Sequence, residues 1–153
     1  MGSAPCLERD LERLDMRDAT VMAINRAGLR YLGRISYWCS YHLSCFISLG
    51  ERWLLRRHAL GGNMDFQVIG QSKYQGLVDI VRPGPQASGS STLYGVLVGL
   101  EMGWPRITVV GAPLDHPEYR NFRQGWSDMR ERLSGGRVKS LSGWTKTFLE
   151  GLR

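Results

Sequence analysis

The residues best suited to chemistry are small or polar side chains in a few short segments. These candidates are Gly2, Ser3, Pro5 and Cys6; Asn25; Gly89, Ser90 and Ser91; Gly111; and the pair Asp115 and His116. Glycine-rich loops that open helices present backbone N–H groups, which can hold a phosphate. An asparagine side chain both donates and accepts hydrogen bonds, so it suits a base or a ribose. Together these residue types fit a nucleotide site, although the chain has neither a Gly-x-Gly-x-x-Gly motif nor a Walker loop.

His116 is the best candidate for a general base, because imidazole titrates near neutral pH. A lone histidine more often has a structural role, and that alternative stays open here. Asp115 could orient His116 or bind a metal, but its commoner use would be to cap the helix expected near Pro117. No serine–histidine–aspartate or cysteine–histidine arrangement stands out, and we predict no metal site.

The stretch from Ser88 to Gly111 organises the rest of the chain, and it reads as a polar loop, a helix and a buried strand. Two stripes run along the predicted helix: apolar Leu93, Val96, Leu97 and Leu100, and small Ser91, Gly95, Gly99 and Gly103. Each glycine inside a helix costs about 1 kcal/mol relative to alanine. That cost is understandable if the helix lies very close to a sheet or a ligand. The loop itself fits a ligand cradle or an ordinary helix cap equally well.

Strands alternate with helices along the sequence. Strands are predicted at 20–25, 35–42, 66–70, 77–81, 107–110 and 138–141, and helices at 7–14, 48–60, 91–102, 119–133 and from 142 onward. In the helix at 48–60, Trp53, Leu54 and Leu55 are expected to be buried, and the arginines to face solvent. Such alternation predicts a three-layer α/β domain with a mostly parallel sheet, formed by residues 1–153. The candidate residues would then converge on one edge of the sheet.

Composition narrows the functional classes. The 153-residue chain carries a net charge of +6, but its basic residues are dispersed, which favours a small anion over a nucleic-acid partner. No apolar run reaches the length of a membrane span, and no signal peptide is visible. Cys6, Cys39 and Cys45 lack metal-ligand spacing and cannot all pair, so we expect reduced thiols and a cytoplasmic location. The oligomeric state is left open.

Several of these motifs, in this order, resemble a Rossmann-like family related to 6-hydroxymethylpterin diphosphokinase and to bacterial sialyltransferases that use a CMP-sugar. The resemblance lies in Gly2-Ser-Ala-Pro-Cys-Leu, Asn25, Gly89-Ser-Ser, Met102-Gly-Trp-Pro-Arg-Ile and Val109-Val-Gly. It implies a nucleotide-binding, transferase-like domain whose ligand would be a nucleotide or nucleotide sugar. A cytidine nucleotide or ATP would be the cofactor. The alternative is a non-catalytic binding or interaction module on the same fold.

The chain also departs from this family. Ala4 and Cys6 stand where the family has glycine and serine, and Pro113 stands where an aspartate is frequent. The large C-terminal lid of the sialyltransferases has no counterpart. The opening loop normally follows a strand, so we expect the first strand to be absent, replaced from elsewhere, or lost to a misplaced start codon. These departures weaken the case for sialyl transfer more than the case for nucleotide binding.

Overall fold

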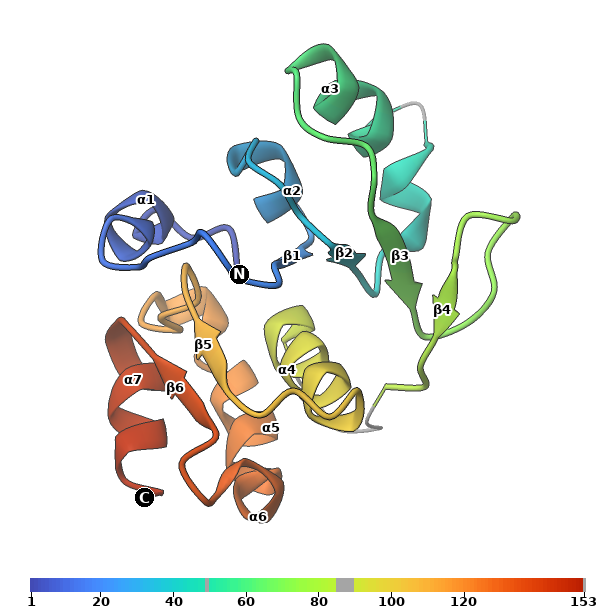
Figure 1. Ribbon diagram of the computed structural model, residues 1–153. Coiled ribbons are helices and arrows are strands. Elements are labelled where there is room, and N and C mark those ends of the chain that lie inside the picture. Colours follow the sequence, from blue (N-terminus) through green and yellow to red (C-terminus); the bar gives the residue numbers. More distant parts are fainter. Residues whose placement is uncertain (49, 85–89, 153) are drawn as a thin grey trace. The chain divides into compact units, whose positions relative to one another are not determined.

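The computed structural model describes residues 1–48, 50–84 and 90–152, and it is a mixed α/β structure with parallel sheets (Figure 1). The chain divides into two compact units. Unit 1 consists of Met1–Leu14 with Pro85–Arg153, and unit 2 is Asp15–Gly84. The α/β class expected from the sequence is confirmed, whereas the single domain spanning 1–153 stays a prediction.

Unit 2 contains a four-stranded parallel sheet in the order β1-β2-β3-β4. Its elements are β1 (Met22–Ile24), α2 (Ala27–Arg30), β2 (Tyr37–Cys39), η1 (Leu43–Phe46), α3 (Trp53–Ala59), β3 (Gln67–Gly70) and β4 (Ile80–Val81). Ala23 pairs with Trp38, and Trp38 pairs with Val68. The four strands predicted in this part of the chain are therefore all present, although shorter than predicted.

Trp38 is the centre of the aromatic core of unit 2 and is fully buried. Its ring stacks on Trp53 at 6.0 Å between centroids and meets Phe46 and Phe66 edge-on. A Cβ on Gly28 would overlap the Trp38 indole, so the start of α2 needs glycine to lie against this ring. In this core, α2 therefore packs directly against the Trp38 ring of β2 at Gly28. The sequence pattern does not reveal this close contact.

The helix predicted at 48–60 needs correction. Within the described residues its α-helical part is α3, which begins at Trp53 after Arg52 in a left-handed conformation with φ of 44°. Leu55, expected in the core, is 59% exposed, and Arg57, expected outside, is fully buried. The prediction for Arg57 was wrong because an arginine in a basic segment usually faces solvent. Here the fold places oxygen acceptors around the whole guanidinium group.

Unit 1 combines the N-terminal helix with a two-stranded parallel sheet and its surrounding helices. Its elements are α1 (Leu7–Leu11), α4 (Ser91–Glu101), β5 (Ile107–Val109), η2 (Pro117–Tyr119), α5 (Phe122–Asp128), α6 (Arg130–Leu133), β6 (Val138–Ser140) and α7 (Gly143–Glu150). Ile107 pairs with Val138 and Val109 with Ser140. Among the described residues, no helix combines the length and apolar composition that a membrane span needs.

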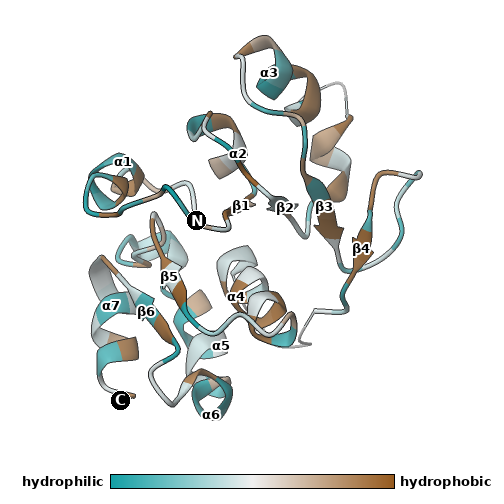
Figure 2. Ribbon diagram, viewed as in Figure 1, coloured by the Kyte–Doolittle hydropathy of each residue, from teal (hydrophilic) through white to brown (hydrophobic). Residues whose placement is uncertain are grey.

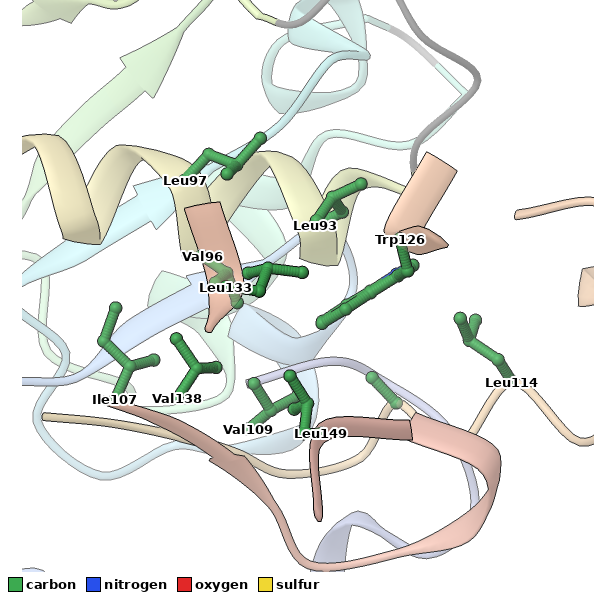
Figure 3. Close-up of a cluster of buried hydrophobic side chains, with 11 residues drawn as sticks. Leu93, Val96, Leu97, Ile107, Val109, Leu114, Trp126, Leu133, Val138 and Leu149 are labelled. Atoms are coloured by element: carbon green, nitrogen blue, oxygen red, sulfur yellow. The ribbon is translucent and has the colours of Figure 1, made fainter. Parts of the chain in front are cut away.

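An apolar cluster from α4, β5, β6 and the C-terminal helices forms the core of unit 1 (Figure 3). Its buried members are Leu93, Val96, Leu97, Ile107, Val109, Ala112, Leu114, Trp126, Leu133, Val138 and Leu149. Hydrophobic colouring runs along β5, whereas α6 is mostly hydrophilic (Figure 2). A Cβ on Gly99 would lie 3.0 Å from Ile107 Cδ1 and 3.1 Å from the Trp104 ring. Gly99 of the predicted stripe therefore lets α4 approach β5, whereas a Cβ on Gly103 would meet no atom within 4 Å.

Two helix predictions in unit 1 are corrected. The helix expected over 119–133 is divided into η2, α5 and α6, and the break at Met129 has φ of −95° and ψ of 13°. Ser142 was expected to cap the last helix but makes no capping hydrogen bond. Its hydroxyl is instead used in a buried hydrogen bond, because the folded chain places a carboxylate within reach.

Candidate functional site

The candidate loop at the start of the chain lies at the carboxyl end of β5. The Gly2 N–H donates to the Val110 carbonyl at 2.7 Å, and the Ala4 N–H donates to the Gly111 carbonyl at 2.9 Å. A Cβ on Gly2 would overlap the Gly111 carbonyl, and Gly111 has a φ of 63°. Both glycines are therefore required by this close approach of two backbones, with half-buried Ser3 between the two bonded residues. The structure thus brings together Gly2, Ser3 and Gly111 of the predicted site.

Asp10 is the most important residue here that the sequence reasoning missed. Its side chain is fully buried, and its Oδ2 accepts hydrogen bonds from the Gly111 N–H at 3.0 Å and from the Ser142 hydroxyl at 2.8 Å. Its Oδ1 has no hydrogen-bond partner. Asp10 lies three residues after Leu7 and four before Leu14, on the apolar face of the predicted helix, and that position was the available signal.

Cys6 lies beside this carboxylate. Its Sγ is 3.4 Å from the Ser142 hydroxyl, and burial raises the pKa of the thiol, with the negative charge of Asp10 adding to the effect. Since the thiolate is the nucleophilic form of cysteine, Cys6 is poorly suited to covalent catalysis near neutral pH. Pro5, Cys6 and Arg9 line an open depression of about 420 Å³. Arg9 is exposed there and supplies a positive charge next to the opening loop.

The loop before α4 has a clear structural use. Ser90 is the N-cap of α4: its Oγ accepts from the Leu93 N–H at 3.2 Å and from the Trp126 indole N–H at 3.3 Å. Ser91 is the first residue of the helix, and Gly89 lies outside the described residues. Two N–H groups already donate to the Ser90 hydroxyl oxygen. The sequence allowed either a ligand-binding loop or a helix cap here, and these bonds directly support the helix cap.

Asp115 and His116 are both engaged at element starts. Asp115 Oδ1 accepts from the Trp144 N–H at 2.8 Å and so caps α7. Capping of the helix near Pro117 was one of the alternatives open for Asp115, and that turn is capped by another side chain. His116 Nδ1 accepts from the Glu118 N–H at 3.4 Å and caps η2. The His116 side chain is 62% exposed, and Arg123 lies 3.7 Å from Asp115. No hydrogen bond between Asp115 and His116 supports the predicted acid–base pairing.

Asn25 belongs to unit 2 and follows β1 with a φ of 50°. Its Oδ1 accepts from the Ser40 hydroxyl at 2.7 Å, and its backbone carbonyl accepts from the Trp38 indole N–H at the same distance. Asparagine tolerates this left-handed conformation better than most residues. Asn25 therefore has a structural role at the end of β1, and its part in a ligand site stays a prediction.

Some of the predicted residues of unit 1 gather at the carboxyl ends of β5 and β6. In unit 1 the Gly2–Cys6 segment, Gly111 and Ser142 lie together after parallel strands, which is the edge where α/β sheets place ligands. Residues 1–48, 50–84 and 90–152 contain no cluster of three histidine, cysteine or acidic side chains that could hold a metal. The three cysteines are free.

The chain matches no protein-family model, no curated protein and no solved structure.

Proposed function

We propose that this protein is a nucleotide-binding, Rossmann-like domain of the transferase type, with a cytidine nucleotide or ATP as its ligand. The observation that carries the proposal is the grouping of the Gly2–Cys6 segment with Gly111 and Ser142 at the carboxyl edge of β5 and β6. The loops at such an edge are where parallel α/β sheets place nucleotide ligands. The proposal includes the Rossmann-like fold family inferred from the sequence motifs.

Arg9 strengthens the case for an anionic ligand. It is exposed at the depression that Pro5 and Cys6 also line, so its guanidinium can pair with a phosphate without being buried. The fully buried Asp10 carboxylate accepts one hydrogen bond from the Gly111 N–H and one from the Ser142 hydroxyl, and so fixes the positions of both residues. In this proposal Arg9 contacts the ligand and Asp10 is a positioning residue.

Calorimetric titration with CMP, CDP, ATP and GTP tests the proposal. We expect one of them to bind with micromolar to millimolar affinity, and Arg9→Gln to weaken that binding severalfold. The matched control is Arg137→Gln, because Arg137 is also exposed but lies before β6, at the opposite end of the strand pair. No heat with any of the four nucleotides, on a folded protein, would contradict the proposal.

A non-catalytic binding module is the second candidate, and one observation favours it. The side chains of Asp115 and His116 both serve as caps, for α7 and η2 respectively, which gives each of them a structural use. Turnover measurements with the nucleotide that binds would separate the candidates. A binding module would show affinity without product formation, whereas a transferase would consume the nucleotide.

A further inference from the structure

Asp10 is a fully buried carboxylate that has no cationic hydrogen-bond partner among the described residues. Both donors to it, the Gly111 N–H and the Ser142 hydroxyl, are neutral, and both bond to Oδ2. Within the same residues, its Oδ1 has no hydrogen-bond partner at all. Buried charges in folded proteins are normally paired with an opposite charge or bound to a metal ion. The Oδ1 atom of Asp10 therefore marks a position for a cation.

Cys6 brings a sulfur atom to the same carboxylate. Cys6 precedes α1 and Asp10 is four residues further along, so their side chains lie on the same side of this helical turn. One atom contacts both of them, because the Ser142 Oγ lies 3.4 Å from Cys6 Sγ and 2.8 Å from Asp10 Oδ2. Burial raises the pKa of the Cys6 thiol, and the nearby negative charge of Asp10 adds to the effect. Sulfur, carboxylate and hydroxyl thus form one small cluster within unit 1.

We propose that Cys6 Sγ, Asp10 Oδ1 and the Ser142 hydroxyl bind a thiophilic divalent cation such as Zn²⁺. On binding, the S–H bond of Cys6 breaks, its proton leaves to solvent, and the sulfur forms a bond to the metal. Thiolate and carboxylate together carry two negative charges, which neutralise a divalent ion. Ser142 keeps its hydrogen bond to Oδ2 and offers an oxygen lone pair. This inference goes beyond the proposed function, because the ligand is a metal ion and not a nucleotide.

The spacing of the donor atoms fits such an ion. Zn²⁺ binds thiolate sulfur at about 2.3 Å and oxygen at about 2.0–2.2 Å, so a sulfur and an oxygen on one tetrahedral ion lie about 3.5 Å apart. The 3.4 Å between Cys6 Sγ and Ser142 Oγ is close to this value. Because a hydroxyl is the third donor, the cluster is not one of the groups of three histidine, cysteine or acidic side chains, which residues 1–48, 50–84 and 90–152 lack.

The cluster opens toward solvent through Cys6. This residue is half-buried and, with Pro5 and Arg9, lines the open depression of about 420 Å³. Asp10 and Ser142 are buried, so an ion enters past the sulfur atom. Three protein donors leave one position of a tetrahedral ion for water. A sulfur ligand selects Zn²⁺ and the softer Cd²⁺ over Mg²⁺, which prefers oxygen ligands.

Titration of the folded 153-residue chain with Cd²⁺, in the absence of nucleotide, tests the proposal through the ultraviolet charge-transfer band of a cadmium–thiolate bond. We expect the band in the parent chain and its loss in Cys6→Ser. The matched control is Cys45→Ser, which should keep the band, because Cys45 is also a half-buried free cysteine but belongs to unit 2.

Calorimetry with Zn²⁺ tests the carboxylate. Residues that merely orient metal ligands already change metal affinity by about 10–100-fold, so Asp10→Asn should weaken Zn²⁺ binding by at least about tenfold. Excess Mg²⁺ should not compete with Zn²⁺ in the parent chain.

Four results would overturn the proposal. They are no cadmium band in the parent chain, a band that persists in Cys6→Ser, equal Zn²⁺ affinity of the parent and Asp10→Asn, and effective competition by Mg²⁺. Circular dichroism establishes first that each variant is folded. If Asp10→Asn does not fold, the two cysteine variants still decide whether the metal binds at Cys6.

Discussion

At the scale of single residues, the two buried ionisable side chains Arg57 and Asp10 form hydrogen bonds with neutral partners. Arg57 donates all five of its N–H groups to oxygens of Gly28, Tyr31, Gly33 and Asn63, at distances of 2.5 to 2.8 Å. Burial lowers the pKa of its guanidinium, which lies 5.8 Å from the Trp38 ring. Carbonyl dipoles and aromatic faces thus replace the carboxylate that a buried arginine usually has.

Replacing Arg57 tests this interpretation. Arg57→Met keeps the apolar stem but leaves buried carbonyls without donors, each of which costs about 1–3 kcal/mol. We expect a loss of about 3 kcal/mol or more in unfolding free energy, measured by urea denaturation. Arg56→Met on the same helix is the control, because Arg56 is exposed. Equal effects of the two substitutions would show that the Arg57 hydrogen bonds contribute little.

For Asp10 we expect a mild and a severe substitution to differ, because only its Oδ2 accepts hydrogen bonds. Asp10→Asn retains an oxygen that can accept from Gly111 and Ser142, so we expect it to cost less than about 1 kcal/mol. Asp10→Ala leaves both donors unpaired, and we expect a loss of about 2–4 kcal/mol in unfolding free energy. Thermal and urea melts of the two variants provide the comparison. An Asn variant as unstable as the Ala variant would mean that the negative charge itself is needed.

At the scale of elements, the closeness of α4 and β5 depends on a glycine inside a helix. The glycine costs helix propensity, but it allows the Ile107 and Trp104 side chains to approach the α4 backbone. The N-cap at Ser90 fixes where the helix begins, and its second hydrogen bond ties that start to Trp126 of α5. Contacts near both ends of α4 thus add to the packing of its apolar face in the core of unit 1.

Gly99→Leu should therefore force α4 away from β5. Overpacking of this kind costs about 1–3 kcal/mol, whereas Gly99→Ala should change stability by less, since improved helix propensity offsets a small displacement of neighbours. Thermal denaturation measures both. Gly151→Leu is the control, because a Cβ there would meet no atom closer than 3.5 Å. A Gly99→Leu variant as stable as the parent would contradict this packing.

At the scale of the whole molecule, the net charge of +6 attracts any anion, so specific and non-specific binding must be separated. A local site such as that at Arg9 involves one or two charge contacts. A polyanion instead samples many dispersed basic residues, and its binding depends strongly on counterion release.

Salt dependence provides the corresponding prediction. Between about 50 and about 200 mM salt, nucleotide affinity should fall by less than about tenfold, whereas binding of a single-stranded DNA oligomer should fall far more steeply. Fluorescence anisotropy with labelled ATP, labelled CMP and labelled DNA measures all three. Persistent DNA binding at the higher salt concentration would favour a nucleic-acid partner after all.

The sequence by itself determined the elements whose signals are local. Alternating apolar segments located the strands of both sheets, and the spacing of Phe122, Trp126, Met129 and Leu133 identified the side that packs on the core. Glycine periodicity indicated the close approach of α4 to β5. These features follow from periodicity and backbone freedom, which depend on neighbouring residues alone.

Only the tertiary structure decided which polar side chains meet. Asp10 bonds to Gly111 and Ser142, which are more than 100 residues away in the chain. Arg57 is buried among the carbonyls of Gly28, Tyr31 and Gly33, which are more than 20 residues away. Asp115 caps α7 instead of the nearer turn at Pro117 for the same reason. A polar side chain takes whichever partner the fold brings within hydrogen-bond distance, and sequence spacing does not encode that distance.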